Sequence, residues 1–468
     1  MKRRWLRLAA VPVLLSFVAA ACGDDDDDDG GGGAETTAAA SDTTAGGSDT
    51  TAGGSDTTAG GGGAGDGKVT ITGSERDEPS VGAINTVLAA FGEENGIEIS
   101  FAGDADWEAN INVQVEAGNP PDIGIFPQPG KLADFARAGS IIPLTEEVTA
   151  AITANWSEDY SNYANVDGTQ FGVPVKTDLK SLVWYVPSAF EAAGYEVPET
   201  FDEFLALIEQ IKEDGNGKPL CVGIESGNAT GWTFTDWTEE MVLRLHGGDV
   251  YDQWVNHEIP FNDPKIVEAM QAVIDVWSEE NVFASGGSIA ATAFQQNADP
   301  LVNGQCFMHR QASFFSGFFA DGTAFADGAE GSVDVFYFPD VNGDRPVLTA
   351  GTFAAAFNED PDTMKVLAYL ASPEYAQLRQ AAQTELLDGG LSGFLSAAQG
   401  QDPGVYQPLE QGFLEILNSS ELSRFDASDL MPAAVGAGSF WTVGTSLVNG
   451  DLSVQEAADQ IEESWPTG

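Results

Sequence analysis

Short apolar runs alternate with longer stretches of helical period at the start of the folded part. VTIT (69–72), IEISF (97–101) and DIGIF (122–126) have the length and composition of strands. AINTVLAAF (83–91), ANINVQVEA (109–117) and KLADFARAG (131–139) follow them in turn and favour helices. This alternation predicts βαβ units and a mostly parallel sheet, so the fold class is α/β.

Two longer helices are marked by their N-terminal signals. Thr200 and Glu203 form a capping box, and the apolar side chains after it recur at helical spacing: Phe201, Phe204, Leu205, Ile208 and Ile211. A second helix is predicted after Asn262-Asp263-Pro264. The apolar side of this helix ends at Trp277, which we therefore expect in the core.

Two apolar segments in the second half flank a turn signal. VDVFYF (333–338) and TFAAAF (352–357) are predicted strands, and DVNGD (340–344) between them is predicted to form a hairpin turn. DVNGD also begins like a calcium loop, but it lacks the Gly at the sixth position and the Glu at the twelfth. We therefore favour the turn and expect no metal there.

The N-terminus has the features of an export signal. Residues 1–21 contain a cationic start, a short apolar run and small residues before Cys22. Ala19-Ala20-Ala21-Cys22 resembles a bacterial lipobox without its usual first Leu, which predicts lipidation of Cys22. A free secreted protein is the alternative.

An acidic, Gly-rich segment separates Cys22 from the folded part. Residues 22–67 include six consecutive aspartates and three copies of SDTTAGG, so we expect a disordered linker. The formal net charge of the chain is −54, which argues against nucleic acid as a partner. Residues 68–468 form a segment that is longer than a single hydrophobic core usually supports, so two lobes are predicted.

Only Cys221 and Cys306 remain after Cys22. In an exported protein such a pair predicts a disulfide, and two buried free thiols are the alternative.

Catalytic and cofactor motifs are scarce: the three histidines show no zinc spacing, and neither GxSxG nor a phosphate-binding loop is present. No metal and no cofactor are therefore expected.

Polar residues next to aromatic ones are instead concentrated in a few short segments. The most unusual is ATGWTFTDW (229–237), which lacks a helical or alternating period and is predicted to be a loop after the strand CVGIES (221–226). Rings and fixed hydrogen-bonding groups together describe a pocket for a neutral polyhydroxylated ligand. For each single tryptophan, burial in the core is the alternative.

Several long segments resemble one protein family. They are GNPPDIGIF (118–126), LADFARAGSIIPL (132–144), GSFW (438–441), IEESWP (461–466), and, more specifically, residues 171–204, 221–264 and 306–314. The chain resembles the extracytoplasmic sugar-binding lipoproteins of bacterial ABC importers, closest to the α-glucoside-binding type, from about Val69 to Trp465. Thr177-Asp178 beside the lysines departs from that pattern.

The resemblance implies a two-lobed periplasmic-binding-protein-like fold (class II), with the ligand cleft between lobes joined by a hinge. It implies a monomeric binding protein, not an enzyme, that is anchored to the cell membrane by its lipid and passes its sugar to permease subunits. The candidate substrate-binding residues are Asp106, Trp107, Lys176, Asp178, Lys180, Tyr185, Glu225, Thr230, Trp232, Asp236, Trp237, Arg310, Gln311, Phe353 and Trp441.

Two other functions stay open at this point. An extracellular glycoside hydrolase would need two carboxylates about 5 to 10 Å apart at the ligand, which 73 acidic residues do not exclude. A sugar sensor would present its closed form to a receptor instead of a permease. No sequence feature separates the sensor from the importer component.

Overall fold

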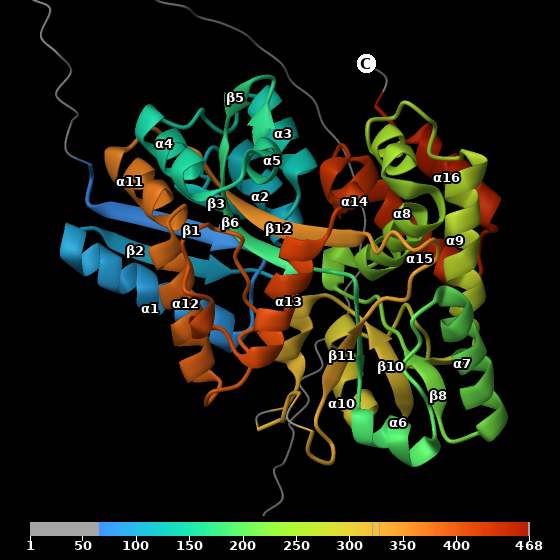
Figure 1. Cartoon of the computed structure of the whole chain (residues 1–468). Helices are drawn as coiled ribbons and strands as arrows, with labels where there is room; N and C mark the ends of the chain where they lie inside the picture. Colours follow the sequence, from blue (N-terminus) through green and yellow to red (C-terminus); the bar gives the residue numbers. More distant parts are fainter. Residues whose placement is uncertain (1–64, 321, 327, 467–468) are drawn as a thin grey trace, which may run out of the picture. The chain divides into compact units, whose positions relative to one another are not determined.

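The computed structural model describes residues 65–466, apart from residues 321 and 327. These residues form two lobes, each built on one β-sheet (Figure 1). The predicted signal peptide, Cys22 and nearly all of the predicted linker lie outside the described residues. Within the part of the chain that the structure describes, no helix combines the length and the apolar character that a membrane span needs.

The sheet of the first lobe is mixed. Its strand order is β13-β12-β3-β1-β2, and β6 also pairs with β12. The pairs β1–β2 and β1–β3 are parallel, as the βαβ pattern predicted, whereas β12 is antiparallel to both β3 and β6. The strands are β1 (Lys68–Gly73), β2 (Glu98–Gly103), β3 (Ile123–Phe126), β6 (Gly172–Leu179), β12 (Val347–Ala356) and β13 (Ser423–Phe425).

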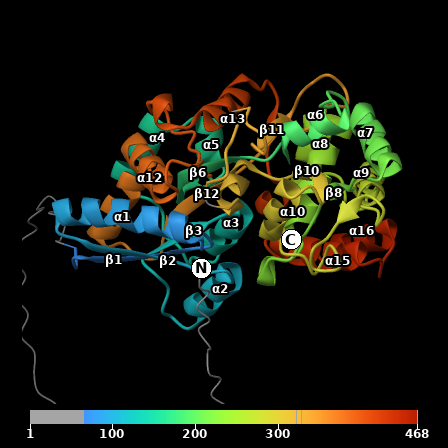
Figure 2. The same ribbon diagram turned by 90° about the horizontal axis from the view of Figure 1, so that it is seen from below.

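Helices cover both faces of this sheet, because its buried strands are apolar on both sides. One face packs on α1 (Glu78–Asn95), α4 (Glu146–Asn155), α11 (Pro361–Leu370) and α12 (Pro373–Leu386). The other face packs on α2 (Trp107–Glu116) and α3 (Pro129–Arg137), and Figure 2 shows α1 and α2 on opposite sides of β1 and β2. Smaller elements beside them are α5 (Glu158–Asn162) and the hairpin of β4 (Asn165–Val166) and β5 (Thr169–Gln170).

The second lobe has a five-stranded sheet of order β11-β7-β10-β8-β9. Its strands are β7 (Leu182–Tyr185), β8 (Lys218–Cys221), β9 (Val282–Phe283), β10 (Cys306–Arg310) and β11 (Asp334–Tyr337). Alternate side chains of β7 enter different cores, since successive residues of a strand point to opposite faces. Val183 packs in one core, and Leu182 and Trp184 pack in the other.

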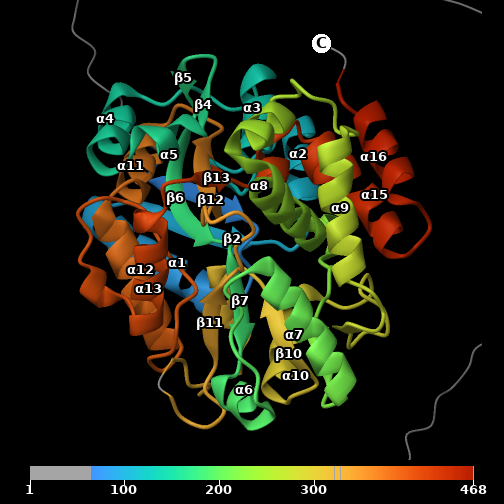
Figure 3. The ribbon, with the colours of Figure 1, turned by 45° about the vertical axis from the view of Figure 1, so that its right-hand side comes forward.

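Most helices of the second lobe cover one face of this sheet. They are α6 (Pro187–Ala193), α7 (Phe201–Asp214), α8 (Trp232–Val255), α9 (Pro264–Val276), α15 (Phe440–Val448) and α16 (Val454–Glu463). Helices α8, α9 and α16 lie side by side (Figure 3). The other face packs on α10 (Ala298–Val302) and α13 (Pro408–Ser419).

The helix signals in the sequence are confirmed. Thr200 caps α7 and forms the predicted capping box with Glu203. Asp263 caps α9, and Trp277 directly after this helix is buried, as predicted. The buried side of α7 consists of Phe204, Leu207, Ile208 and Ile211, while Leu205 is exposed, so the apolar period predicted the helix better than its exact face.

The predicted hairpin around DVNGD is wrong. β11 pairs with β7 in the second lobe, whereas β12 pairs with β3, β6 and β13 in the first lobe. Residues 338–346 therefore connect the two sheets and do not close a hairpin. A turn signal between two strands cannot show that the strands pair with each other, because pairing depends on the rest of the sheet.

The chain passes between the lobes at several places. Lys180 and Ser181 alone separate β6 from β7 (Figure 3). Residues 338–346 return the chain to the first lobe, and Asp426 leads from β13 to the short helix α14 (Ala427–Leu430), which packs on α8. These connections are the crossing segments, and they form the hinge of the two-lobed fold.

The predicted disulfide between Cys221 and Cys306 is confirmed. It joins the end of β8 to the start of β10, two neighbouring parallel strands of the second lobe, with a Cα–Cα distance of 5.5 Å. The bond closes a loop across 85 residues.

Candidate functional site

A cavity of about 220 Å³ lies where the two lobes and the crossing segments meet. The loops that follow β1 and β3 line it, at the carboxyl ends of parallel strands where ligands of open α/β sheets bind. Further first-lobe residues on the wall come from β6, β12 and α12. The first-lobe wall is mostly polar and includes Glu75, Asp77, Gln128, Lys176, Asp178, Thr352, Arg379 and Gln383.

The second lobe contributes an aromatic wall to the same cavity. It consists of Trp232, Phe294, Phe314 and Phe318. The ring centroids of Trp232 and Phe294 are 4.9 Å apart, and those of Phe294 and Phe318 are 5.3 Å apart. The rings of Trp232 and Phe314 lie 6.0 Å apart. A ligand in the cavity would therefore meet polar groups on one side and ring faces or edges on the other.

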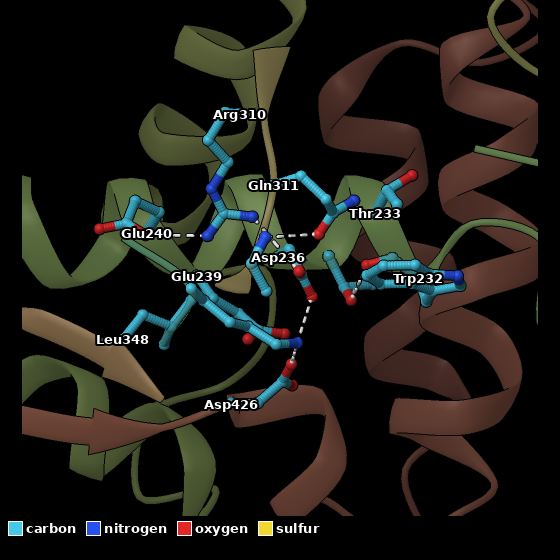
Figure 4. A network of polar contacts seen from close by, with 12 residues as sticks. Trp232, Thr233, Asp236, Glu239, Glu240, Arg310, Gln311, Leu348 and Asp426 are labelled. Carbon is cyan, nitrogen blue, oxygen red and sulfur yellow. Dashed lines mark hydrogen bonds and ion pairs between the residues drawn. The ribbon is translucent and has the colours of Figure 1, made fainter. Parts of the chain in front are cut away.

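Three charged residues at the hinge form the hinge ion cluster: Lys180, Asp236 and Asp426. The Nζ atom of Lys180 donates a hydrogen bond of 2.7 Å to Oδ1 of Asp236 and another to Oδ2 of Asp426. Figure 4 labels the two accepting residues, Asp236 and Asp426. All three residues are buried and line the cavity. Because they come from a crossing segment, from α8 and from the segment after β13, the cluster connects the hinge with the second lobe.

A second layer of ion pairs supports this cluster from behind. Arg310 of β10 donates to Oδ2 of Asp236 at 3.2 Å and to Oε2 of Glu240 at 2.8 Å. Glu240 also accepts from Ser181 in the first crossing segment and from Arg244. Opposing charges satisfy one another throughout this layer, as buried ions require.

Glu239 connects α8 with the third crossing segment. Its two carboxylate oxygens accept hydrogen bonds from the backbone N–H groups of Ala427 and Ser428, at 3.0 and 3.1 Å. An oxygen atom of Glu239 lies near oxygens of Asp236 and Asp426, a grouping that could hold a metal ion. The Lys180 ammonium already pairs with two of these three carboxylates, those of Asp236 and Asp426.

The buried acids around Lys180 have different pKa values, because burial and nearby charges act on each of them to a different degree. Burial raises the pKa of Asp236 to about 6, although Lys180 and Arg310 act against it. Burial also opposes ionisation of Asp426, but the nearby Lys180 ammonium and several hydrogen bonds lower its pKa to about 2. Burial, with Asp426 close by, raises the pKa of Glu239 and of Asp429 well above the usual range. Asp426 is thus the firmly ionised partner of Lys180.

Several polar atoms on the cavity wall are buried without a hydrogen-bond partner among the described residues. The acceptors are Oε2 of Glu75, Oε1 of Gln128 and Oε1 of Gln383, the donors are Nε1 of Trp441 and Nε and Nη1 of Arg379, and the hydroxyl Oγ1 of Thr352 can do either. Buried polar groups are normally paired, because an unpaired one costs about 1 to 3 kcal/mol. This mixture of acceptors and donors fits a ligand with O–H groups, because a hydroxyl group can both donate and accept.

Six of the predicted substrate-binding residues line the cavity: Lys176, Asp178, Lys180, Trp232, Asp236 and Trp441. The Nζ atom of Lys176 lies 3.2 Å from Asp178 and 5.2 Å from the centroid of the Phe314 ring. That of Lys180 lies 5.6 Å from the centroid of the Trp232 ring. The cations therefore connect the polar wall with the aromatic wall.

Four other predicted residues lie beside the cavity without lining it. Asp106 accepts a hydrogen bond from the backbone N–H of Asn228 at 3.4 Å, and Trp107 is buried with its indole N–H on Thr72. Glu225 accepts from the N–H of Gly227, and the hydroxyl of Thr230 donates to the carbonyl of Gly227. Glu225 and Thr230 thus hold the turn at Gly227, whereas Asp106 and Trp107 make contacts with residues distant along the chain.

The structure corrects the expectation that Trp237 is displayed to a ligand. The stretch 229–237 is not a loop, because α8 begins at Trp232, and the Trp237 ring packs against Trp277 and Phe338 in the core. The first three turns of α8 are buried almost all round, which removes the one-sided apolar period that marks a surface helix.

Four further predicted residues also lie off the cavity. Phe353 is fully buried beside Tyr160 and Phe425, and Tyr185 packs against Phe190 and Phe336. Arg310 is buried and donates hydrogen bonds to the carboxylates of Asp236 and Glu240. The side-chain carbonyl of Gln311 accepts a hydrogen bond from the backbone N–H of Ala312.

Several wall residues were missed by the sequence analysis, chiefly Glu75, Phe294, Phe314, Arg379 and Gln383. Arg379 and Gln383 lie on α12, whose sequence contains many polar residues and gives no sign that some of them face a cavity. Phe314 is the last residue of the segment 306–314, which resembles the sugar-binding family, so this resemblance could have indicated it.

Sequence comparison agrees with the two-lobed architecture and the cavity between its lobes. The chain belongs to the bacterial extracellular solute-binding protein family, whose profile matches residues 77–377. It is therefore an extracytoplasmic binding protein and not an enzyme, as the resemblance predicted.

Two curated relatives cover most of the chain. The osmoprotective compounds-binding protein GgtB of Synechocystis is 38% identical over 391 residues, which are 82% of this chain and 89% of that protein. The alpha-glucosides-binding periplasmic protein AglE of Rhizobium meliloti is 38% identical over 415 residues, which are 85% of this chain and 86% of that protein.

Solved structures share the fold at lower identity. A chitin oligosaccharide binding protein superimposes with a TM-score of 0.71 at 17% identity, covering 85% of this chain and 97% of that one. Maltose-bound MalE3 of T. maritima gives a TM-score of 0.65 at 18% identity, with coverage of 85% and 98%.

Proposed function

We propose that the protein is the sugar-binding component of an ABC importer and that its ligand is an α-glucoside. The observation that carries this proposal is the cavity itself, where an aromatic wall faces buried acceptors that lack partners. Sugars have this complementary pattern, with C–H faces for rings and O–H groups for acceptors. AglE binds α-glucosides, and its 38% identity to this chain supports the α-glucoside class.

Binding would act on the hinge because both lobes line the cavity. A ligand that contacts the polar wall and the aromatic wall together binds the closed form more tightly than the open form, and so shifts the population toward closure. The closed form would then be recognised by permease subunits in the membrane. The cavity is complete within one copy of the chain, which supports action as a monomer.

Isothermal titration calorimetry of residues 68–468 against maltose, trehalose, sucrose and maltotriose tests this function. We expect one site per chain and saturable binding of at least one α-glucoside. Overnight incubation with the same sugars should release no glucose. The absence of binding to every sugar would contradict the proposal, and release of glucose would favour a hydrolase.

We propose further that lipid on Cys22 anchors the protein to the outer side of the cell membrane. The order of signal, small residues, cysteine and acidic linker supports this anchor. In cells, Cys22→Ser should release the protein from the membrane fraction or block its processing. A processed variant that stays in the membrane fraction would refute the anchor.

A further inference from the structure

One end of the cavity in the first lobe is a polar recess, formed by Glu75, Ser80, Arg379, Gln383 and Ser392. All five residues line the cavity. Glu75 follows β1, Ser80 lies in the first turn of α1, and Arg379 and Gln383 are four residues apart on one face of α12. The recess is therefore built from regular elements that pack closely, since α1 and α12 are in extensive contact.

The side chains of the recess hold one another in place. Nη2 of Arg379 donates to Oε1 of Glu75 at 2.6 Å, and the Lys176 ammonium lies 3.7 Å from the same oxygen. Nε2 of Gln383 donates to Oγ of Ser80 at 3.0 Å and to the backbone carbonyl of Ser392 at 2.5 Å. Glu75, Arg379 and Gln383 are thus each fixed through one polar atom, and their other polar atoms are left over.

Two of the polar atoms left over are acceptors, and Nε and Nη1 of Arg379 are donors that also lack a hydrogen-bond partner among the described residues. Oε2 of Glu75 and Oε1 of Gln383 are buried and have no hydrogen-bond partner among the described residues. The amide orientation of Gln383 follows from chemistry, because the carbonyl of Ser392 can only accept, so the NH₂ group must face it. Gln383 is only 4% exposed, and its carbonyl oxygen is therefore a preorganised acceptor.

The charges of the recess are balanced. The carboxylate of Glu75 faces the guanidinium of Arg379, and Asp178 faces the ammonium of Lys176. Burial opposes ionisation of Glu75, but Arg379 and Lys176 outweigh it and lower its pKa, so the side chain can only accept. A ligand anion would add a third negative charge beside Glu75 and Asp178, and a ligand cation would add a third positive charge beside Arg379 and Lys176.

We propose, resting on the sugar-binding function above, that this recess is a subsite for one sugar ring and determines specificity. Oε2 of Glu75 and Oε1 of Gln383 accept hydrogen bonds from two hydroxyl groups of that ring. The subsite selects a neutral hydroxylated ring and rejects the same ring when it carries a carboxylate or an ammonium group.

Gln383→Met tests the subsite, because it keeps the length of the side chain and removes the acceptor. We expect calorimetry to show roughly tenfold weaker binding of the tightest sugar among maltose, trehalose and sucrose. Gln377→Met is the matched control on the same helix: its side chain does not line the cavity, and the affinity should be unchanged. Glu75→Gln is a second variant that should also weaken binding.

Monodeoxy analogues of that sugar separate a ligand contact from a structural role. In the wild-type protein, one analogue should bind about tenfold more weakly than its parent, and in Gln383→Met the same analogue and the parent should bind equally. The uronic acid and amino forms of the ring should bind the wild-type protein more weakly than the neutral form. If Gln383→Met and Glu75→Gln bind the sugar like wild type and no analogue shows this coupling, the subsite is refuted while the sugar-binding function stands. If the wild-type protein binds no sugar, the function itself fails.

Discussion

The Nζ atom of Lys180 lies 2.7 Å from Oδ1 of Asp236, deep between the lobes. Lys180 belongs to the segment of two residues between β6 and β7, and Asp236 lies in the second turn of α8. The contact therefore connects the hinge with α8, the helix whose first residue, Trp232, lines the cavity. A ligand that contacts Lys180 would act directly on the crossing segment, and one that contacts Asp236 would act on it through this bond.

Replacing Lys180 should destabilise the protein strongly. Lys180→Met leaves Asp236 and Asp426 buried without their shared cation, and breaking a buried ion pair typically costs about 3 to 5 kcal/mol. Chemical denaturation monitored by circular dichroism measures the loss. The double variant Lys180→Met/Asp236→Asn should recover part of it, because one buried charge is removed. A single variant as stable as wild type would show that the cluster contributes little.

Trp232 and Trp237 offer a matched pair of substitutions five positions apart. Trp232→Ala should weaken sugar binding by about 1 to 3 kcal/mol with little change in stability, since the ring is part of the cavity wall. Trp237→Ala should instead lower the free energy of unfolding by about 3 to 5 kcal/mol, because it empties a core site. Calorimetry and thermal melting of both variants distinguish the roles. Equal melting temperatures for the two variants would contradict this assignment.

His309 should make stability depend on pH. Burial lowers its pKa to about 4 from about 6.5, helped by the nearby Arg310. Between these two pKa values the histidine binds a proton in the unfolded chain but not in the folded protein. Stability is therefore lost as the pH falls from about 6.5 toward 4. The full effect is roughly 3 kcal/mol. His309→Gln should flatten this part of the profile in denaturation experiments from pH 7.5 to 4. A variant with the wild-type slope would exclude His309 as its cause.

The disulfide should stabilise the protein without taking part in binding. Cys221→Ala/Cys306→Ala should lower the free energy of unfolding by up to about 4.5 kcal/mol, because the bond closes a long loop in the unfolded chain. Sugar affinity of the folded variant should stay within twofold, about the size of calorimetric error, since neither cysteine lines the cavity. Thiol labelling of the unreduced, denatured wild type should find no reactive cysteine in residues 68–468. Two labelled cysteines there would contradict the bond.

Local signals predicted the elements well and their partners less well. The six alternating segments from VTIT to KLADFARAG became β1, α1, β2, α2, β3 and α3, because each carries its own period and turn residues. The pairing of β12 with β3 could not be predicted, since more than 200 residues separate them along the chain. For the same reason the hairpin predicted at DVNGD does not form.

The candidate site was only partly predictable. Lys180, Trp232 and Asp236 came from segments whose composition is unusual, and all three line the cavity. Arg379 and Gln383 could not be found, because a polar residue on a helix looks the same in sequence whether it faces water or a cavity. Trp237 was misassigned because a helix buried on all sides has no apolar face to detect.

The interleaving of the lobes has a consequence for how the chain reaches its native state during synthesis. The β1–β2–β3 unit can pair early, but the second neighbour of β3 is β12, so this edge of β3 stays open until about residue 356 has emerged. The sheet is complete only after β13, within the last fifty residues of the chain. Open strand edges promote association between unfinished chains. A nascent chain of this protein therefore needs protection along almost its entire length, whereas a protein with lobes encoded one after the other could fold its first lobe early.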